Sequence, residues 1–233
     1  MNLQACDSPA LLAQRLAAWI AERLQQALAE RGHAVLAVSG GRSPLALFQA
    51  LRSQALDWSR VSVTLVDERC VPPDHPDSNS ALVREHLLQD AAQAARFVPW
   101  FDEVPATLDD AALTALAEGA NKRLAREPWP WDLAVLGMGE DGHTASLFPG
   151  AAGLAQALRA SGPVAWTRPS TAPHARLTLT LPALLDTRAL VLPLSGASKL
   201  RVLQQARLRE DPALPISHLL HQHRTPVHTW TAP

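Results

Sequence analysis

Apolar residues recur at helical spacing over the first long segment of the chain, from Pro9 to Arg31. They follow one another at intervals of mostly three and four residues: Leu12, Leu16, Trp19, Ile20, Leu24 and Leu28. This spacing predicts an amphipathic helix with one buried face. We expect Ser8 to cap its start, Pro9 to suit its first turn, and Gly32 to end it.

Short apolar runs follow this helix, and most of them end in glycines or charged residues. The run 34–38 breaks at Ser39-Gly40-Gly41, and Ser43-Pro44 then opens a helix that continues to Leu51. Further strands are expected at 61–66, 131–136, 177–181 and 190–194, and further helices at 81–88, 108–126 and 197–207. Short apolar strands that alternate with helices predict an α/β fold with a mainly parallel sheet covered on both faces. The order of the strands does not follow from this pattern.

Composition narrows the classes of protein to consider. The chain has 233 residues, of which 47% are hydrophobic, and it shows no internal repeat or low-complexity linker. We therefore expect a single domain over residues 1–233. The 21 basic and 22 acidic residues give a net charge of −1. A broad basic surface for nucleic acid or for an anionic membrane is not expected from this balance.

Cysteine usage and the chain's beginning bear on location. Cys6 and Cys70 form no CxxC pair, and residues 1–9 lack a basic segment followed by an apolar one. No apolar run approaches the roughly 18 residues that a membrane span needs. These features predict a soluble cytoplasmic protein without disulfides or a signal peptide. They give no indication of the oligomeric state.

The first polar cluster follows the first predicted strand. Its members are Ser39, Gly40, Gly41, Arg42, Ser43 and Pro44. Two glycines allow backbone N–H groups to point inward, and the next helix presents its positive N-terminal end. This arrangement favours a phosphate-binding turn, although an ordinary strand-to-helix turn has the same pattern.

The second cluster, Asp67-Glu68-Arg69, follows the strand at 61–66 and continues to Ser78-Asn79. Three charged residues directly after a buried strand are expected to face a polar cleft. There Arg69 could bind a carboxylate, a phosphate or a developing oxyanion. The alternative is a solvated loop with internal salt bridges. Cys70 has no obvious base beside it and is not expected to act as a nucleophile.

The third cluster lies between Leu136 and Gly150, just beyond another strand. Its glycines surround one acidic residue and one histidine, Asp141 and His143. Imidazole titrates near neutrality, so a general base oriented by an acidic neighbour is the natural interpretation. A structural histidine is the alternative. A metal site at His218, His221 and His223 is not expected, because no carboxylate or cysteine in that stretch completes a ligand set.

Together the three clusters resemble those of the 6-phosphogluconolactonase family. The resemblance extends over essentially the whole chain and includes Arg176–Thr180, Gly196 with Lys199, and a late strand at 226–230. It implies a Rossmann-like fold similar to glucosamine-6-phosphate deaminase and ribose-5-phosphate isomerase. The implied reaction is hydrolysis of 6-phosphogluconolactone to 6-phosphogluconate in the oxidative pentose phosphate pathway, without a metal or organic cofactor.

The resemblance also implies roles for the matching residues. His143 is the implied base, Asp141 its orienting partner, and Arg69 is grouped with them as a catalytic residue. The implied contacts to phosphate and sugar are made by Ser39, Gly40, Gly41, Arg42, Ser43, Asp67, Arg176 and Lys199, with Arg69 a further candidate. Relatives commonly have threonine at the position of Ser43, and either hydroxyl can cap the next helix. Arg42 is often a smaller residue in relatives, which leaves its role open.

Two other functions remain to be weighed against hydrolysis of the lactone. A glucosamine-6-phosphate deaminase or isomerase would share the Asp-Gly-His triplet but would need a carboxylate near the sugar C2. The continuation Thr144–Pro149 favours the lactonase. A non-catalytic sugar-phosphate sensor would keep the phosphate-binding turn without needing a base, so the Asp141/His143 pair argues against it.

Overall fold

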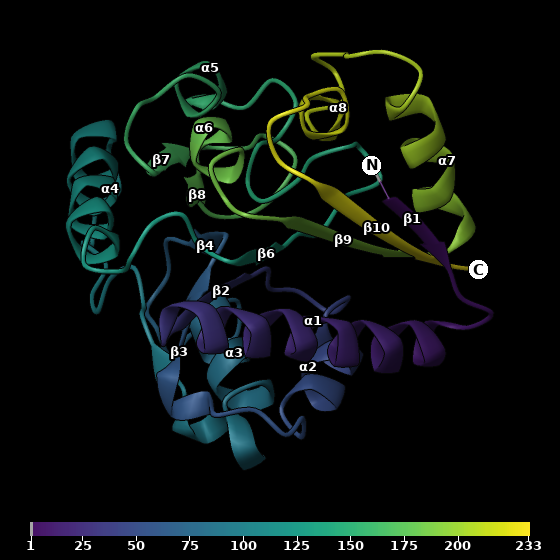
Figure 1. Ribbon diagram of the computed structural model, residues 1–233. Helices are drawn as coiled ribbons and strands as arrows, with labels where there is room; N and C mark the ends of the chain where they lie inside the picture. Colours follow the sequence, from purple (N-terminus) through teal and green to yellow (C-terminus); the bar gives the residue numbers. More distant parts are fainter. Residues whose placement is uncertain (1) are drawn as a thin grey trace.

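The computed structural model describes residues 2–233, which form two β-sheets with helices around them (Figure 1). The larger sheet has seven strands, all parallel, in the order β1-β10-β9-β6-β2-β3-β5. Its strands are β1 (Asn2–Ala5), β10 (Val227–Ala232), β9 (Leu190–Ser195), β6 (Leu133–Val135), β2 (Ala34–Val38), β3 (Val61–Leu65) and β5 (Arg96–Phe97). The mainly parallel sheet expected from the alternating pattern is confirmed.

A second, antiparallel sheet was not predicted. It has three strands in the order β4-β8-β7, which are β4 (Asp67–Arg69), β8 (Arg176–Leu179) and β7 (Val164–Thr167). The predicted strand at 177–181 therefore lies in this sheet and not among the parallel strands. Val66 joins the two sheets, because its N–H donates to Val38 O at 3.0 Å and its carbonyl accepts from Leu179 N–H at 2.8 Å.

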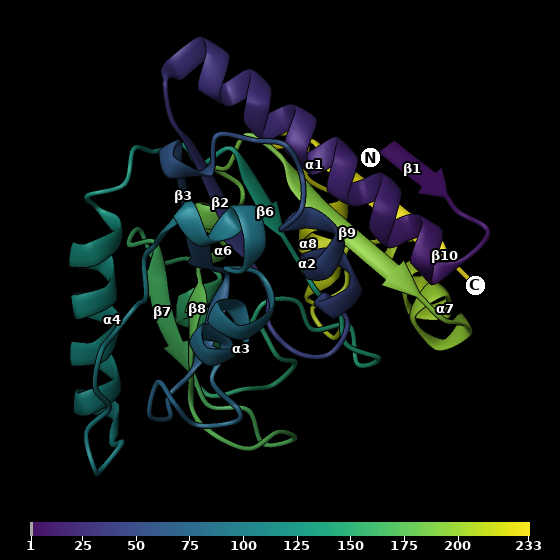
Figure 2. The same ribbon diagram turned by 90° about the horizontal axis from the view of Figure 1, so that it is seen from below.

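Helices cover both faces of the larger sheet. In Figures 1 and 2, α1 and α2 lie on one face, and α7 and α8 lie on the other. The helices are α1 (Pro9–Arg31), α2 (Leu45–Leu51), α3 (Asn79–His86), α4 (Asp110–Leu124), α5 (Leu154–Ala157), α6 (Leu181–Leu184), α7 (Ala197–Ala206) and α8 (Ile216–Leu220), with 3₁₀ turns η1 (Trp58–Arg60) and η2 (Asp90–Ala94). This two-sided covering is the one expected for a parallel sheet.

Helix α1 begins and ends where the sequence predicts. The Ser8 hydroxyl accepts a hydrogen bond from Leu11 N–H at 3.2 Å. Gly32 adopts the left-handed conformation, with φ 79°, and its N–H donates to Leu28 O. Both ends of the helix thereby satisfy backbone groups that have no partner inside the helix.

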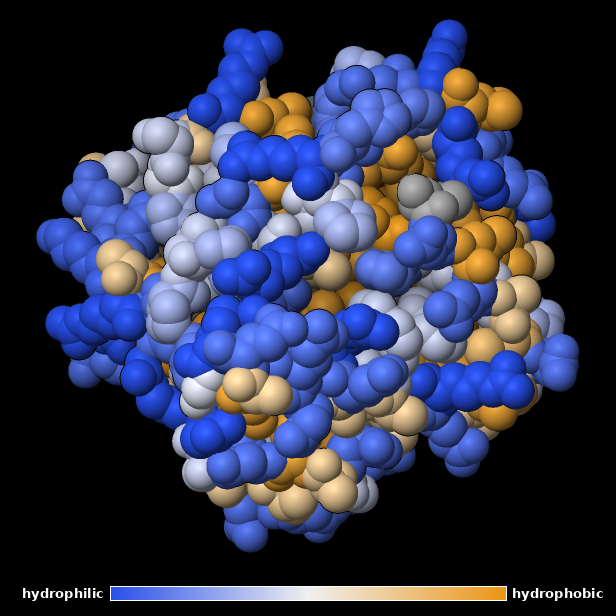
Figure 3. Space-filling view, viewed as in Figure 1, coloured by the Kyte–Doolittle hydropathy of each residue, from blue (hydrophilic) through white to orange (hydrophobic). Residues whose placement is uncertain are grey.

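The surface of the described chain carries few large apolar side chains. Among residues 2–233, Leu3 and Leu208 are the exposed ones. Figure 3 shows one face of the molecule, on which apolar residues form scattered patches between hydrophilic ones. Among residues 2–233, no helix has both the length and the hydropathy needed to span a membrane.

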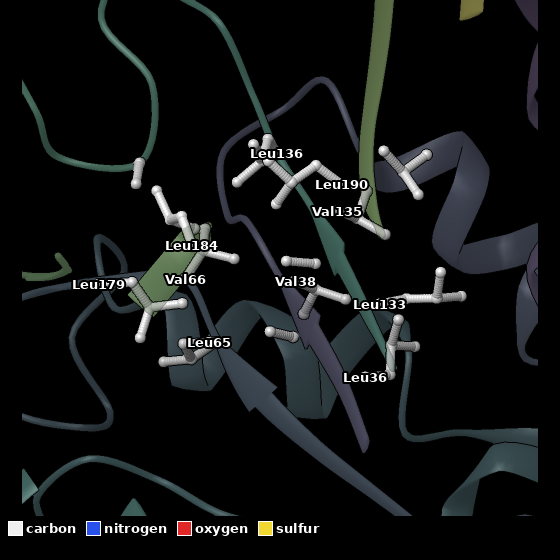
Figure 4. Close-up of a cluster of buried hydrophobic side chains, with 14 of the residues drawn as sticks. Leu36, Val38, Leu65, Val66, Leu133, Val135, Leu136, Leu179, Leu184 and Leu190 are labelled. Atoms are coloured by element: carbon white, nitrogen blue, oxygen red, sulfur yellow. The ribbon is translucent and has the colours of Figure 1, made fainter. Parts of the chain in front are cut away.

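The hydrophobic core joins the two sheets (Figure 4). Side chains from β2, β3, β6, β8, β9 and α6 meet there, among them Leu36, Val38, Leu65, Leu133, Val135, Leu179, Leu184 and Leu190. All of these are at most 2% exposed. Full burial of such a side chain stabilises the fold by roughly 1.5–3 kcal/mol. The core thus holds the small sheet firmly against the carboxyl ends of the parallel strands.

Strand order reverses between β2 and β6. The chain passes from β2 to β3 on one side and later returns to β6 on the other. Ser39 N–H donates to Val135 O at 3.0 Å and links the ends of these two strands. Open α/β sheets bind ligands at the carboxyl ends of their strands, at such a reversal. The first and third polar clusters both begin at this point.

Candidate active site

A cleft of about 630 Å³ lies at the carboxyl ends of β2 and β6. The structure brings together at this cleft every residue that the sequence singled out for the site. These residues are Ser39, Gly40, Gly41, Arg42, Ser43, Asp67, Arg69, Asp141, His143, Arg176 and Lys199. They come from segments far apart in the chain, so their convergence is a property of the fold.

The turn after β2 is shaped by its two glycines. A Cβ atom on Gly40 would lie 1.8 Å from the side-chain oxygen of Asn79, so only glycine fits against that residue. Gly41 has a φ of 85°, which disfavours other residues. Ser39 donates its hydroxyl to Val135 O at 2.9 Å and so also fixes the turn to β6.

The Ser43 hydroxyl, which could have capped the next helix, does not cap α2. The capping position is occupied by Pro44, and no side chain makes a capping hydrogen bond there. The Ser43 hydroxyl instead accepts a hydrogen bond from Lys199 Nζ at 3.1 Å. Lys199 is part of α7, so this contact brings an ammonium group to the turn after β2.

The second cluster is not a solvated loop, because Asp67 and Glu68 are only 7% and 1% exposed. Asp67 lines the cleft and accepts hydrogen bonds from Ser146 Oγ at 2.6 Å and Asn79 Nδ2 at 3.3 Å. It therefore joins three parts of the site: β4, the start of α3 and the segment after β6.

Glu68 accepts hydrogen bonds from the backbone around the site. Its carboxylate accepts from the N–H groups of Arg69, Asn79 and Ser80, each at 2.7 Å, and from Ser78 Oγ at 3.3 Å. Burial raises the pKa of Glu68, and the hydrogen bonds from Asn79 and Ser80 act in the opposite direction. Glu68 thus holds the start of α3 against β4.

Replacing Glu68 by alanine should lower the free energy of unfolding by about 2–4 kcal/mol, because two buried N–H groups and one partly buried N–H group lose their acceptor. Urea unfolding followed by circular dichroism measures this loss. Glu85→Ala, on the exposed face of α3, is the matched control and should change stability by less than about 0.5 kcal/mol. Equal stability of the two variants would contradict the role given to Glu68.

Arg69 and Arg176 face each other across the antiparallel pair β4–β8. Like charges in this position repel, so the arrangement favours an anion between or beside them. The Nε atom of each is buried and has no hydrogen-bond partner among the described residues. Burial lowers the pKa of Arg176, and the charge of Arg69 acts in the same direction. Two guanidinium groups with unused donors are suited to binding an anion.

Asp141 and His143 form a hydrogen-bonded pair in the third cluster. His143 Nδ1 lies 2.6 Å from Asp141 Oδ1, and His143 N–H donates to the same oxygen at 3.1 Å. An ionised carboxylate only accepts, so Nδ1 carries the proton and Nε2 keeps its lone pair. The imidazole ring stacks on Phe148 with centroids 3.9 Å apart. Position, tautomer and orientation of the imidazole are all set by neighbours.

The backbone around this pair is tightly bent. A Cβ atom on Gly139 would lie 2.2 Å from His143 Nδ1 and 2.4 Å from Asp141 Oδ1. Gly139 N–H donates to His143 O at 2.9 Å, which closes the loop. Ala145 has a φ of 47°, an unfavourable conformation for a residue with a Cβ atom. Glycine at 139 is what allows the loop to fold over its own histidine.

Several supporting residues had no predicted role. Phe148 and Ser146 lie inside the segment that the sequence singled out, but nothing in it shows that one stacks on His143 and the other bonds Asp67. Thr171, Ala172 and Pro193 also line the cleft. They are small or neutral residues in ordinary contexts, and they carry no sequence signal.

Thiol and metal chemistry find little support among the described residues at or beside the cleft. Burial raises the pKa of Cys70 to about 12, so its thiol stays protonated at neutral pH. Of the described His, Cys, Asp and Glu side chains, one group is spaced to hold a metal ion, and none of its members lines the cleft.

The whole chain is similar to known proteins. The model of the family described as glucosamine-6-phosphate isomerases/6-phosphogluconolactonase matches residues 7–230. A 6-phosphogluconolactonase of Pseudomonas aeruginosa is 47% identical over 214 residues, which cover 91% of this chain and 87% of that protein. A 6-phosphogluconolactonase of Rhizobium meliloti is 44% identical over 235 residues, which cover 100% of this chain and 99% of that protein. The crystal structure of a 6-phosphogluconolactonase from Shewanella baltica, 42% identical, matches 100% of this chain and 98% of its own with a TM-score of 0.93.

Proposed function

This chain belongs to the family of glucosamine-6-phosphate isomerases and 6-phosphogluconolactonases, and we propose how its cleft hydrolyses a lactone. The reaction converts 6-phosphogluconolactone to 6-phosphogluconate, a step of the pentose phosphate pathway. The observation that carries the mechanism is the Asp141–His143 pair, which lies in a cleft that also contains Arg69, Arg176 and Lys199. A base and several cations in one cleft suit a phosphorylated ester.

In this mechanism His143 is the general base. Its Nε2 takes a proton from a water molecule, and the resulting hydroxide attacks the lactone carbonyl carbon. A tetrahedral oxyanion forms, the bond from this carbon to the ring oxygen breaks, and His143 returns the proton to that oxygen. Asp141 stays ionised and stabilises the imidazolium that forms. A lactone is already an activated ester, so no covalent nucleophile is required.

The cations of the cleft are proposed to bind the charged parts of the substrate. Arg176 and Lys199 contribute to binding the phosphate, with the Gly40–Gly41 turn beside Lys199. Arg69, with its unused buried Nε, donates to phosphate or to the oxyanion. A donor aimed at the oxyanion contributes roughly 3 kcal/mol to the transition state. A phosphate bound away from the carbonyl fixes which atom meets His143.

Arg176→Gln and Lys199→Gln should each raise KM by about tenfold or more, because a hydrogen bond to a charged group contributes roughly 1.5–3 kcal/mol. kcat should change by much less, since neither side chain moves a proton. The matched controls are Arg207→Gln and Lys122→Gln. Arg207 follows the last residue of α7 and Lys122 lies in α4; both are exposed and outside the cleft. Steady-state kinetics decide the matter, and an unchanged KM in both cleft variants would remove these residues from the phosphate site.

The activity itself is tested by generating 6-phosphogluconolactone in situ and following acid release, with and without the purified protein. The protein should accelerate hydrolysis well above the spontaneous rate, both before and after treatment with a chelator. If a folded sample gives no acceleration, the lactonase function is wrong. Release of ammonia from glucosamine 6-phosphate would then test the deaminase that shares the Asp-Gly-His triplet.

A further inference from the structure

Two loops that border the cleft meet at a cluster of two histidines and one aspartate. His75 and Asp77 lie between β4 and α3, and His174 lies between β7 and β8, two residues before Arg176. One potential ligand atom from each lies within 4.8 Å of the others. None of the three lines the cleft, so the mechanism of hydrolysis does not account for them.

The spacing within this cluster is close to that of a tetrahedral metal site. His174 Nε2 lies 2.9 Å from Asp77 Oδ2, and His75 Nδ1 lies 3.9 Å from the same oxygen. Bonds of about 2.0–2.1 Å from zinc place neighbouring ligand atoms roughly 3.3 Å apart in a tetrahedron. Small movements of the two rings would reach this spacing.

We propose that His75, Asp77 and His174 bind a zinc ion, which ties the two loops together at the rim of the cleft. Two imidazole nitrogens and one carboxylate oxygen are ligands that Zn²⁺ accepts, and water would complete the tetrahedron. Because none of its three ligands lines the cleft, the ion stabilises the rim and takes no part in hydrolysis. The proposal therefore stands apart from the expectation that catalysis needs no metal.

The backbone at His174 supports a built site. Its φ is 69°, and among residues 2–233 only two other non-glycine residues, Asp90 and Ala145, have a positive φ. This conformation is unfavourable for a residue with a Cβ atom and persists at positions where the surrounding structure requires it. Here it directs the imidazole of His174 to Asp77, on the other loop.

Accessibility also suits metal binding. The side chains of His75, Asp77 and His174 are 39%, 51% and 28% exposed, so an ion can reach them from solvent. The two cysteine thiols, at Cys6 and Cys70, are buried and do not compete for the ion.

Two contacts weaken the site relative to a structural zinc centre. His75 Nδ1 accepts a hydrogen bond from Asp77 N–H at 3.0 Å, and this hydrogen bond is lost when Nδ1 binds zinc. Arg69 Nη1 donates to Asp77 O at 2.5 Å and brings a positive charge near the ion. We therefore expect an ion that binds reversibly and that a chelator removes.

The test is calorimetric titration of chelator-treated, tag-free protein with zinc chloride. One zinc ion per chain should bind, and His75→Ala and His174→Ala should each weaken binding by at least about tenfold. His223→Ala, at an exposed histidine outside the cluster, is the matched control and should bind as the unaltered protein does. No binding, or binding that survives His174→Ala, would overturn the proposal.

Two further measurements separate loss of the ligand from loss of the fold. Asp77→Asn keeps the size of the side chain and should also weaken zinc binding. Co²⁺ should give the visible absorption of a tetrahedral site in the unaltered protein and not in these variants. Zinc should raise the Tm of the unaltered protein but not that of Asp77→Asn. A zinc-dependent Tm that Asp77→Asn preserves would place the ion elsewhere.

Discussion

His143→Ala should lower kcat by about 100- to 10,000-fold, because the variant has no group that can take the proton from water. Asp141 cannot replace it: its carboxylate is a weaker base, and in this structure its Oδ1 points at the imidazole. Substrate binding should change little, since the phosphate contacts proposed above do not involve the histidine. The measurement is initial rates with lactone generated in situ, corrected for spontaneous hydrolysis.

Three controls make the result specific to proton transfer. The Kd for the product, 6-phosphogluconate, should stay within a few-fold of the unaltered protein, which shows that the cleft is intact. Added imidazole should restore part of the lost rate, because it can occupy the space beside Phe148. The kcat of Asp141→Asn should lie between those of the unaltered protein and His143→Ala, since an amide no longer fixes the proton on Nδ1. A kcat within tenfold of the unaltered value for His143→Ala would mean that another group is the base.

The pairing of Asp141 with His143 could be predicted because it is local. The two residues are two positions apart, and the glycines around them permit the bend that joins them. The stacking of His143 on Phe148 is different. It depends on how the segment after β6 packs on the small antiparallel sheet, through contacts such as Ser146 N–H to Thr178 Oγ1 at 3.1 Å. Such contacts join distant parts of the chain and leave no local pattern.

Buried strands such as β2 and β9 could be predicted because they are mainly apolar runs. Strand β2 matches its predicted bounds, 34–38, and β9 extends one residue beyond 190–194. Strand β1 was missed because all four of its residues are exposed and it has no apolar pattern to detect. Strand β4 was missed for another reason. Its three residues are charged, and their burial depends on β8 and on the start of α3.

The second cluster shows where local chemistry misleads. Several consecutive charged residues normally lie in a solvated loop, and this was the alternative interpretation for residues 67–69. Burial of Asp67 and Glu68 became possible because donors from two other segments, the start of α3 and the segment after β6, satisfy their oxygens. A buried carboxylate with such partners is stable, whereas one without them is not. The two carboxylates can be identified from the sequence, but their hydrogen-bond donors are brought to them only by the fold.

Gly139→Ala should lower kcat by at least about 100-fold, although it leaves both Asp141 and His143 in the chain. The added Cβ atom would lie 2.2 Å from His143 Nδ1 and 2.4 Å from Asp141 Oδ1, which is far inside contact distance. The two side chains must therefore separate, and the imidazole loses its position and its fixed tautomer. Stability should fall less than activity, because these side chains are 28% and 42% exposed and can move toward solvent.

Gly137→Ala is the matched control, since it adds the same atom to the same loop. Its Cβ would come no closer than 3.9 Å to a neighbouring atom, the Ser39 hydroxyl oxygen. This variant should keep kcat within a few-fold of the unaltered protein. The nitrogen-15 chemical shifts of the His143 ring should change in Gly139→Ala and not in Gly137→Ala, which reports the tautomer directly. If both variants lose activity equally while the His143 signals stay unchanged, contact of the imidazole with Asp141 is not what limits the rate.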